Sequence, residues 1–376
     1  MIGIHRLESN IHNILDQFTS LTLPAPFWEK YPESLIYGAG NMGKDVSNVL
    51  TKHGIPILGF LDQKAQPDDF WNGVPIYQPD AEFISSDKRE MVNVIIAIHN
   101  RDAEIPPIIE KLKNIGFSKI ITVIEFYDYF GQDLGNRYWL TSRSWYRSFE
   151  KEISDCLGLW ADEKSREIFL NTLRFRLTGN YSMCPHPEEG NCQYTPFDIL
   201  NYELPLRFVD CGAFDGDILE SFLDAGIPLQ SVAAFEPDQA NFNKLAQFVQ
   251  LNSDRIPNAC LWPCGVYSSV MQSRFETSKG ESSKLSPEGN TIIQCVSLNH
   301  AILNFAPTLI KMDIEGAEYE ALLGANEIIK KYRPSLALCV YHEPEHLWQI
   351  PLLIRDLCDN NGGVQLLSQD TLLQWV

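Results

Sequence analysis

The chain has no long apolar run and comparatively few basic residues. No stretch of its 376 residues approaches the ~20 apolar residues that span a membrane, so we expect no membrane span. Its 30 Lys and Arg residues stand against 49 Asp and Glu residues, which gives a net charge of −19. A surface that binds nucleic acid needs clustered basic residues to contact phosphates. We therefore expect no nucleic-acid partner.

The nine cysteines include no C-x-x-C pair. An odd number of cysteines without paired spacing is typical of reduced thiols. The N-terminal stretch has acids and amides where a signal peptide needs an unbroken apolar core. These features predict a cytoplasmic protein. The segment from Cys184 to Cys192 matches no common zinc spacing, and we interpret it as a surface loop.

The length suits two domains, and a hydrophobic fraction of 44% is that of a globular protein. The pattern of apolar runs predicts an α/β fold with two Rossmann-like doubly wound domains joined by a helical connector. The expected parts are an N-terminal helix within 1–33, a first α/β domain at 34–124, a helical connector at 125–205 and a second α/β domain at 206–376.

The first α/β domain opens with a glycine-rich turn. An apolar strand leads into Gly38-x-Gly40-x-x-Gly43, a helix follows, and the next strand ends at Asp62, 19 residues after Gly43. This is the spacing of the dinucleotide fingerprint. It makes Gly38, Gly40, Gly43 and Asp62 a second candidate nucleotide site, for NAD(P) or a nucleotide sugar. The alternative is a nucleotide fold retained for packing or for a homodimer.

A second strand, turn and helix begin at Arg207. The strand ends at Asp210, the turn runs to Gly216, and we expect Asp217 to be the N-cap of the helix. The following strand ends at Glu236, 20 residues past Gly216, where a carboxylate can accept hydrogen bonds from both ribose hydroxyls. This pattern predicts a nucleoside-binding unit.

The two turns differ in charge. A dinucleotide brings an anionic pyrophosphate to such a turn, and Asp210 with Asp215 at its mouth would repel it. S-adenosylmethionine carries no phosphate, and its sulfonium and ammonium groups favour acidic surroundings. Electrostatics therefore favour S-adenosylmethionine at the second turn and tolerate a phosphate at the first.

Polar residues end several strands of the second domain, namely Asp210, Glu236, Asp313 and His342. In open α/β sheets, ligands bind at the carboxyl ends of the strands. We therefore expect the ligand site there. We also expect one helix over 318–331 and a strand, with an antiparallel partner as one option, over 291–298.

Three motifs in this domain resemble the FkbM family of S-adenosylmethionine-dependent methyltransferases. They are Asp210-Cys-Gly-Ala-Phe-Asp-Gly216, Ala234-Phe-Glu-Pro-Asp238 and Ile310-Lys-Met-Asp-Ile-Glu-Gly-Ala-Glu318. The resemblance covers about residues 205–350, and an N-terminal Rossmann-like domain on such a module is similar to bacterial polysaccharide-related members. It implies a class I methyltransferase fold and O-methylation of a sugar, polysaccharide or natural-product hydroxyl, with a small molecule or glycan as acceptor.

The resemblance also implies a set of cofactor-binding residues. By analogy Gly212 and Gly216 frame S-adenosylmethionine, Glu236 holds its ribose, and Asp313 lies near the methyl group. The full set is Asp210, Gly212, Ala213, Phe214, Asp215, Gly216, Glu236, Pro237, Gly265 and Asp313. The sheet of this class closes with a late antiparallel hairpin, for which the chain offers only the short segment 364–376.

The candidate catalytic residues are Asp313, His342 and Glu315. A sugar hydroxyl is a weak acid and benefits from a base within hydrogen-bond reach, which Asp313 or His342 could supply. We assign no metal, although Asp313, Glu315 and Glu318 could instead hold a divalent cation. The structural alternatives are a cofactor-amine partner for Asp313, a helix cap for Glu315 and a buried core histidine for His342.

Two rival functions stay open on the sequence alone. One is a non-catalytic nucleotide-binding scaffold protein of a glycan biosynthesis complex. The other is an NAD(P)-dependent sugar-nucleotide oxidoreductase working from the first domain. Residues 34–124 hold no Tyr-x-x-x-Lys pair, and their only histidines are His53 and His99, which disfavours the oxidoreductase.

Overall fold

The computed structural model describes residues 11–17, 25–80, 84–99, 103–184, 203–276, 284–285, 289–302, 304–358, 363–366 and 371–375. Internal contacts divide the chain into two compact units. Unit 1 comprises residues 1–150 and 173–184, and unit 2 comprises residues 151–172 and 185–376. Residues 11–17 are helical and belong to the segment 1–33 in which an N-terminal helix is predicted; residues 1–10 and 18–24 lie outside the described residues.

Unit 1 is built on a six-stranded sheet in the order β3-β4-β2-β1-β5-β6. The strands are β1 (Ser34–Tyr37), β2 (Ile57–Leu61), β3 (Phe70–Trp71), β4 (Val74–Tyr77), β5 (Asn93–Ile96) and β6 (Lys119–Thr122). Every pair is parallel except β3 with β4. Strands β1 and β5 are buried along their whole length, and after their first residues, Ser34 and Asn93, both are continuous apolar runs.

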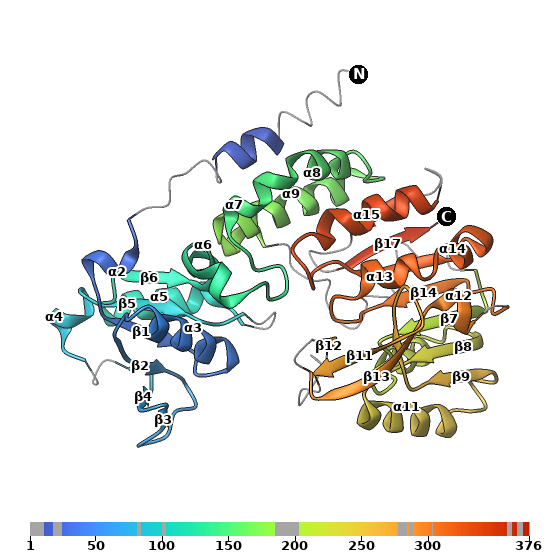
Figure 1. The fold of residues 1–376 in the computed structure, drawn as a ribbon, viewed down its shortest axis with the longest axis horizontal. Helices are drawn as coiled ribbons and strands as arrows, with labels where there is room; N and C mark the ends of the chain where they lie inside the picture. The colour runs from blue at the N-terminus through green and yellow to red at the C-terminus, as the bar shows by residue number, and fades with distance from the viewer. Residues whose placement is uncertain are drawn as a thin grey trace. The chain divides into compact units, whose positions relative to one another are not determined.

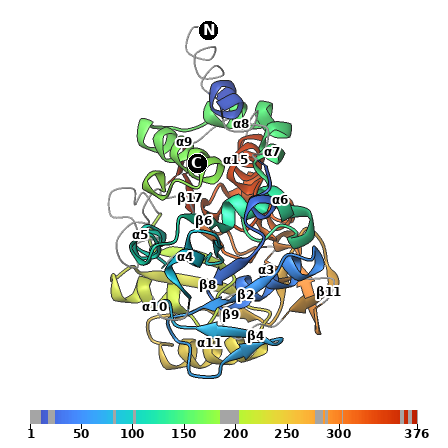
Figure 2. The same ribbon diagram turned by 90° about the vertical axis from the view of Figure 1, so that its left-hand side faces the viewer.

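Helices cover both faces of this sheet, as a doubly wound fold requires. The chain moves outward from β1 to β2 on one side and from β5 to β6 on the other, so α3 (Asn41–Lys52) and α5 (Ile105–Ile115) lie on opposite faces (Figure 2). The unit also contains α2 (Phe27–Lys30), α4 (Ser86–Arg89), α6 (Val123–Leu134), α7 (Arg143–Tyr146), the 3-10 helix η1 (Arg147–Phe149) and η2 (Tyr181–Met183). The predicted Rossmann-like domain is confirmed.

In the described part of the region predicted as a helical connector, residues 125–184 are mainly helical, and these helices divide between the two units. Helices α6 and α7 belong to unit 1, whereas α8 (Glu150–Leu157) and the first part of α9 (Glu163–Thr178) belong to unit 2. Within unit 2 they support the C-terminal strands, because Ala161 N–H donates to the Val364 carbonyl and Leu366 N–H to Ser165 Oγ. The loop predicted at 184–192 lies almost entirely outside the described residues.

Unit 2 is built on a seven-stranded sheet in the order β16-β17-β15-β14-β7-β8-β9 (Figure 1). The strands are β7 (Leu206–Cys211), β8 (Leu229–Phe235), β9 (Ala259–Trp262), β14 (Leu309–Met312), β15 (Ser335–Cys339), β16 (Gly363–Leu366) and β17 (Thr371–Trp375). Only β17 runs antiparallel to its neighbours. The short C-terminal segment therefore does form the hairpin that closes the sheet.

Helices α10 (Asp217–Asp224) and α11 (Gln239–Leu251) pack Leu219, Phe222 and Leu245 against one face of this sheet. The N-cap of α10 is Gly216, so the predicted N-cap, Asp217, is wrong by one residue. The chain continues with α12 (Leu298–Ala301), α13 (Glu318–Leu323), α14 (Asn326–Tyr332) and α15 (His346–Leu357).

The single helix predicted over 318–331 is also wrong, since α13 and α14 are separated at Gly324 and Ala325. A Cβ on Gly324 would lie 2.2 Å from the Tyr267 carbonyl oxygen. The backbone at this break therefore packs directly on a distant segment, which accepts only glycine.

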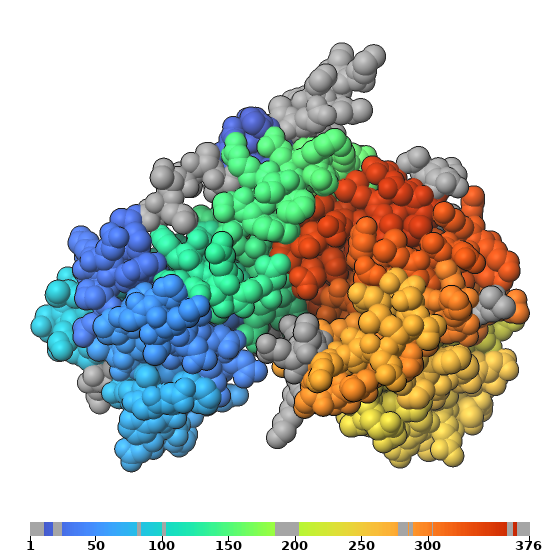
Figure 3. All heavy atoms as spheres, viewed as in Figure 1, coloured from blue at the N-terminus to red at the C-terminus, as the bar shows by residue number. Residues whose placement is uncertain are grey.

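A second sheet of unit 2 has the order β10-β13-β11-β12. It contains β10 (Gly265–Val266), β11 (Met271–Glu276), β12 (Lys284–Leu285) and β13 (Thr291–Val296). Strand β13 pairs antiparallel with β11, as the sequence allowed. The sheet lies at the surface of the unit (Figure 3), and Ile292 is 64% exposed. Within the described residues, no helix is both long and apolar enough to cross a membrane.

Candidate functional site

The strand order of unit 2 reverses between β7 and β14, and the predicted site residues gather at this point. The chain proceeds from β7 to β8 and β9 on one side, and from β14 to β15 on the other. Such a switch point at the carboxyl ends of parallel strands is where α/β sheets bind ligands. Asp313 N–H donates to the Cys211 carbonyl at 3.1 Å, so the turns after β7 and β14 are in contact.

Glycine is required where these two turns meet. Gly212 has φ +80°, and a Cβ there would lie 1.9 Å from the Asp313 carbonyl oxygen. Gly216, with φ +100°, ends the turn and caps α10. Both positions favour glycine on backbone grounds alone. The turn from Gly212 to Gly216 is therefore fixed by its own geometry, close to Asp313.

Glu236 joins the turn after β7 to the loop after β8. Its Oε2 accepts from Phe214 N–H at 2.9 Å and its Oε1 from Asp238 N–H at 2.8 Å. The side chain is 6% exposed, and burial raises the pKa of Glu236 to about 7. Each carboxylate oxygen has two lone pairs, so both can accept a further hydrogen bond.

The remaining residues of the predicted turn occupy the same loop pair. Ala213 is buried and its N–H donates to the Phe235 carbonyl at 3.0 Å. Phe214 has a left-handed backbone conformation, with φ +47°. The Asp215 Oδ2 atom lies 3.7 Å from Lys244 Nζ. Pro237 stands between Glu236 and Asp238 in the loop after β8. Asp238 caps α11 by accepting from two backbone N–H groups. The predicted residues Ala213, Phe214, Asp215 and Pro237 therefore all lie in the two loops that follow β7 and β8.

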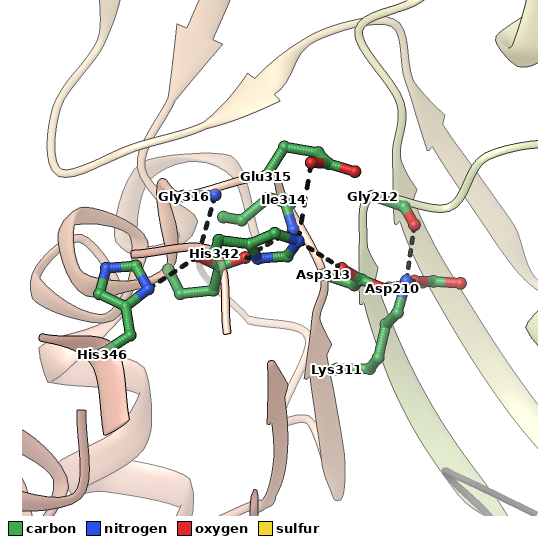
Figure 4. Close-up of polar contacts among 10 residues, drawn as sticks. Asp210, Gly212, Lys311, Asp313, Ile314, Glu315, Gly316, His342 and His346 are labelled. Carbon is green, nitrogen blue, oxygen red and sulfur yellow. Dashed lines mark hydrogen bonds and ion pairs between the residues drawn. The ribbon is translucent and has the colours of Figure 1, made fainter. Parts of the chain in front are cut away.

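The structure places Asp210 inside the sheet and not at the mouth of the turn. Asp210 is fully buried, and its Oδ1 lies 3.1 Å from Lys311 Nζ. Lys311 also donates to the Gly212 carbonyl at 2.6 Å (Figure 4). Burial raises the pKa of Asp210 to about 6. This buried pair holds the turn through the Gly212 carbonyl. The prediction that both Asp210 and Asp215 place negative charge at the mouth of the turn is therefore wrong for Asp210.

Three carboxylates surround His342, which follows β15. His342 Nδ1 lies 2.8 Å from Glu318 Oε1, while Nε2 lies 3.4 Å from Asp313 Oδ1 and 3.7 Å from Glu315 Oε2 (Figure 4). His342 is 3% exposed. Burial alone would lower the pKa of His342, but the three acids raise it to about 9. The protonated imidazole, which carries a proton on both ring nitrogens, is therefore favoured. In this form His342 cannot serve as a base.

Glu318 organises the turn between β14 and α13. Its Oε1 accepts from Ile314 N–H at 2.8 Å and its Oε2 from Gly316 N–H at 3.1 Å. His346 Nδ1 lies 3.4 Å from Oε2. Sequence reasoning missed His346 and the anchoring role of Glu318. The available sequence signal was the second histidine four residues after His342.

Gly265, predicted to bind the cofactor, lies in β10 of the four-stranded sheet. A Cβ there would lie 3.2 Å from Cys295 Sγ and 3.3 Å from Ile293 Cδ1. Close packing within that sheet is a sufficient reason for glycine at this position.

The four residues of the second candidate site meet in unit 1. Gly38 has φ +103°, and a Cβ on Gly43 would lie 1.9 Å from the Gly38 carbonyl oxygen. Gly40 is the N-cap of α3, and a Cβ there would meet no atom within 4 Å. Asp62 Oδ2 accepts from Ala39 N–H at 2.9 Å. The turn is thus held by an acid in the same way as the turn in unit 2.

Comparison with known proteins agrees with this geometry. Residues 210–362 match the model of the methyltransferase FkbM domain. The chain carries an FkbM methyltransferase domain. Residues 34–103 match the PglD N-terminal domain, which covers most of the sheet of unit 1. The FkbM match extends from Asp210, before the Gly212–Gly216 turn, to beyond His342 and His346, so it contains the whole candidate site of unit 2.

One crystal structure resembles the chain over almost its full length. It is that of methyltransferase FkbM from Methylobacillus flagellatus KT, with a TM-score of 0.76 and 19% identity. The similarity covers 99% of this chain and 100% of that chain. At this identity the likeness concerns the fold. Comparison with curated proteins gives no match.

Proposed function

We propose that the FkbM domain transfers a methyl group from S-adenosylmethionine to a hydroxyl of a sugar or of a related glycan or natural product. The observation that carries the proposal is the meeting of the Gly212–Gly216 turn, Glu236 and Asp313 at the strand switch point. In α/β sheets, ligands bind at this edge, where side chains at the strand ends can contact both the cofactor and the reacting hydroxyl.

The donor set fits this cofactor. Glu236 keeps free lone pairs on both oxygens and is rigidly placed by two backbone N–H groups, as a ribose partner must be. A pyrophosphate needs backbone N–H groups that point at it, but the first three N–H groups of this turn are used within the protein: Gly212 and Ala213 donate to the Phe235 carbonyl, and Phe214 donates to Glu236. S-adenosylmethionine supplies a methyl group on a good leaving group, so the protein mainly aligns the acceptor and helps remove its proton.

Asp313 is the residue we assign to proton removal. It directly follows β14, and its side chain is 31% exposed, so a substrate hydroxyl can reach it. His342 lies behind it at 3.4 Å and holds the carboxylate in place. His342 thus acts as a positioning residue, and Glu315 is a further contact of the same ring.

The test is turnover of methyl-labelled S-adenosylmethionine with a panel of nucleotide sugars and oligosaccharides. We expect label transfer to at least one hydroxylated acceptor, with Asp313→Asn reducing kcat by about 10²–10⁴-fold, the usual effect of losing an acid–base group. Cofactor binding without transfer to any acceptor would favour the scaffold alternative. Unchanged kcat in Asp313→Asn would remove Asp313 from the reaction.

We further propose that unit 1 binds a nucleotide or nucleotide sugar at the Gly38–Gly43 turn. The supporting observation is the open space at Gly40 beside a turn that Asp62 holds. Titration calorimetry with nucleoside diphosphate sugars and with NAD(P) distinguishes the ligand classes. Gly40→Val should abolish that binding, because its side chain enters the open space. Equal binding by the variant would contradict the site.

A further inference from the structure

Four polar side chains of unit 1 gather beside its glycine turn, where the strand order of the sheet reverses between β1 and β5. Such a switch point is where α/β sheets bind ligands. Strand β5 lies between β1 and β6, so the loop after β5 leaves the sheet between α3 and α6, which follow those strands and contact each other. The His99 cluster consists of one side chain from this loop, one from α3, one from α6 and one from the segment after α6: His99, Asp45, Tyr127 and Arg137.

Arg137 connects the members of this cluster. Its Nη1 donates to Asp45 Oδ2 at 2.6 Å, and both side chains of the pair are partly exposed. Burial and then the Arg137 guanidinium lower the pKa of His99 to about 4. Burial raises the pKa of Tyr127, while Arg137 opposes that rise and Asp45 adds to it. The imidazole and the hydroxyl therefore both lie near the Arg137–Asp45 pair.

Tyr127 and His99 have hydrogen-bonding groups that the described residues do not satisfy. Tyr127 is 1% exposed, and its hydroxyl has no hydrogen-bond partner in this part of the chain. His99 is partly exposed, and its ring centroid lies 5.8 Å from that of Tyr138 and 5.1 Å from that of Trp139. Within the same residues its ring nitrogens form no hydrogen bond. Because buried polar groups in native proteins are hydrogen-bonded, an orphaned hydroxyl calls for a bound water or ligand.

A strained turn holds Arg137 and the two aromatic residues against His99. Leu140 N–H donates to the Arg137 carbonyl at 3.1 Å, and Tyr138 has φ +53°, which bulky residues rarely adopt. Backbone strain of this kind clusters at functional sites. The turn lies beyond residues 34–103, which match the PglD N-terminal domain, so the fingerprint at Gly38–Gly43 does not reveal it.

The composition of the His99 cluster suits a sugar. A carboxylate accepts hydrogen bonds, a guanidinium donates them, and a hydroxyl or a neutral imidazole does both. With a pKa of about 4, His99 is neutral at pH 7. Arg137 has five N–H donors, of which one binds Asp45. Sugar hydroxyls likewise donate and accept, whereas the nicotinamide ring of NAD(P) offers these groups a single amide.

We propose that the His99 cluster binds the glycosyl group of a nucleoside diphosphate sugar. The nucleotide lies along the Gly38–Gly43 turn, with Asp62 at its ribose and the diphosphate at the start of α3. The N–H groups of residues 40–42 form no hydrogen bond within the described residues, so they can receive the diphosphate. The sugar subsite rests on the nucleotide binding proposed for unit 1, and it selects a nucleotide sugar over NAD(P).

Titration calorimetry of the full-length protein measures this binding without any turnover. The probes are UDP-glucose, UDP-N-acetylglucosamine, GDP-mannose, ADP-glucose and dTDP-glucose, each compared with its nucleoside diphosphate, together with NAD and NADP. We expect at least one nucleotide sugar to bind about tenfold more tightly than its nucleoside diphosphate. Tyr127→Phe should weaken binding of that sugar nucleotide about two- to tenfold, the effect of one hydrogen bond. Arg137→Gln should weaken it by about tenfold or more, because a charged donor is lost. Neither variant should change the affinity for the nucleoside diphosphate.

The matched control is Tyr129→Phe on the same helix. Tyr129 packs against Phe27 and Trp28, so its variant should bind every probe as the unchanged protein does. Because no described residue pairs with the Tyr127 hydroxyl, Tyr127→Phe should melt at the same temperature as the unchanged protein or higher. A melting curve therefore separates a lost ligand contact from a damaged fold.

The outcomes separate the sugar subsite from the nucleotide site. Equal affinity for nucleotide sugars and nucleoside diphosphates, tighter binding of NAD or NADP, or unchanged sugar-nucleotide binding in Tyr127→Phe overturns the sugar subsite and leaves the nucleotide site in place. Absence of binding by every nucleotide defeats the nucleotide site of unit 1, and the sugar subsite with it. Neither result affects the cofactor assignment in unit 2, which S-adenosylhomocysteine tests separately.

Discussion

At the scale of single residues, Glu236 is the side chain on which the cofactor assignment depends most. It follows strand β8 and is almost fully buried. Its carboxylate accepts hydrogen bonds from the backbone of two loops, at Phe214 and at Asp238. The sequence predicted its place and its ribose role, but not that it also holds Phe214. Its second function explains why the turn keeps its shape before any ligand arrives.

The pKa of Glu236 predicts how cofactor affinity depends on pH. Burial raises this pKa to about 7, and the ionised carboxylate is the form that accepts ribose hydroxyls. Below the pKa a proton must be released on binding, so affinity falls as pH decreases. We expect S-adenosylhomocysteine to bind roughly tenfold more tightly at pH 8 than at pH 6, since binding follows the ionised fraction. Calorimetry at both pH values measures this, and Glu236→Gln should bind weakly and independently of pH. A flat profile for the unchanged protein would contradict the assignment.

The Asp210–Lys311 pair is the second residue-scale test. Lys311→Met leaves the Asp210 carboxyl and the Gly212 carbonyl without their buried cation. Removing one partner of a buried pair typically costs about 3–5 kcal/mol. We expect that loss in the free energy of unfolding of unit 2, measured in urea. Adding Asp210→Asn should recover part of it, because no unpaired charge remains. Strict additivity of the two changes would mean that the pair does not interact.

At the scale of elements, both glycine turns follow the same construction. In each, one glycine lets the backbone of a neighbouring segment approach within contact distance: Gly43 against Gly38, and Gly212 against Asp313. The acid after the next strand then binds the turn. The spacing of the glycines and acids was enough to predict where each turn and its acid lie, but not the hydrogen bonds from the acids to the turns or the contact of Gly212 with Asp313.

Other features depended on contacts between distant segments, so the sequence could not supply them. Gly324 interrupts a good helical pattern because it packs on the Tyr267 backbone. Gly265 belongs to a different sheet from the rest of its predicted set. Asp210 was expected at the mouth of the turn, but it is the next-to-last residue of the buried strand β7, and its side chain lies against Lys311 inside the protein. In each case the partner lies in another element, which a pattern along one segment does not reveal.

The glycine geometry gives a paired prediction for unit 1. Gly43→Ala forces a Cβ to within 1.9 Å of a backbone oxygen, whereas Gly40→Ala points into open space. Overpacking typically costs about 1–3 kcal/mol. We expect Gly43→Ala to lower the melting temperature of unit 1 clearly and Gly40→Ala to leave it almost unchanged. Similar melting temperatures for the two variants would show that the turn is not packed as described.

At the scale of the whole molecule, the boundary of unit 2 lies before its first strand. Helix α8 and the start of α9 belong to it, and Ala161 and Ser165 bond to strand β16. We expect a fragment of residues 151–376 to fold and to bind S-adenosylhomocysteine as the full chain does. A fragment of residues 203–376 should be clearly less stable, because it exposes the edge of the closing hairpin. Equal melting temperatures of the two fragments would show that α8 and α9 do not stabilise unit 2.

The central claim is that unit 2, and not unit 1, binds S-adenosylmethionine through the Gly212–Gly216 turn and Glu236. Titration calorimetry of the full-length protein with S-adenosylhomocysteine tests it most directly. We predict binding of one ligand per chain, lost in Glu236→Ala and retained in Gly40→Ala. No heat at millimolar ligand with folded protein, or an equal loss of binding in both variants, would contradict it.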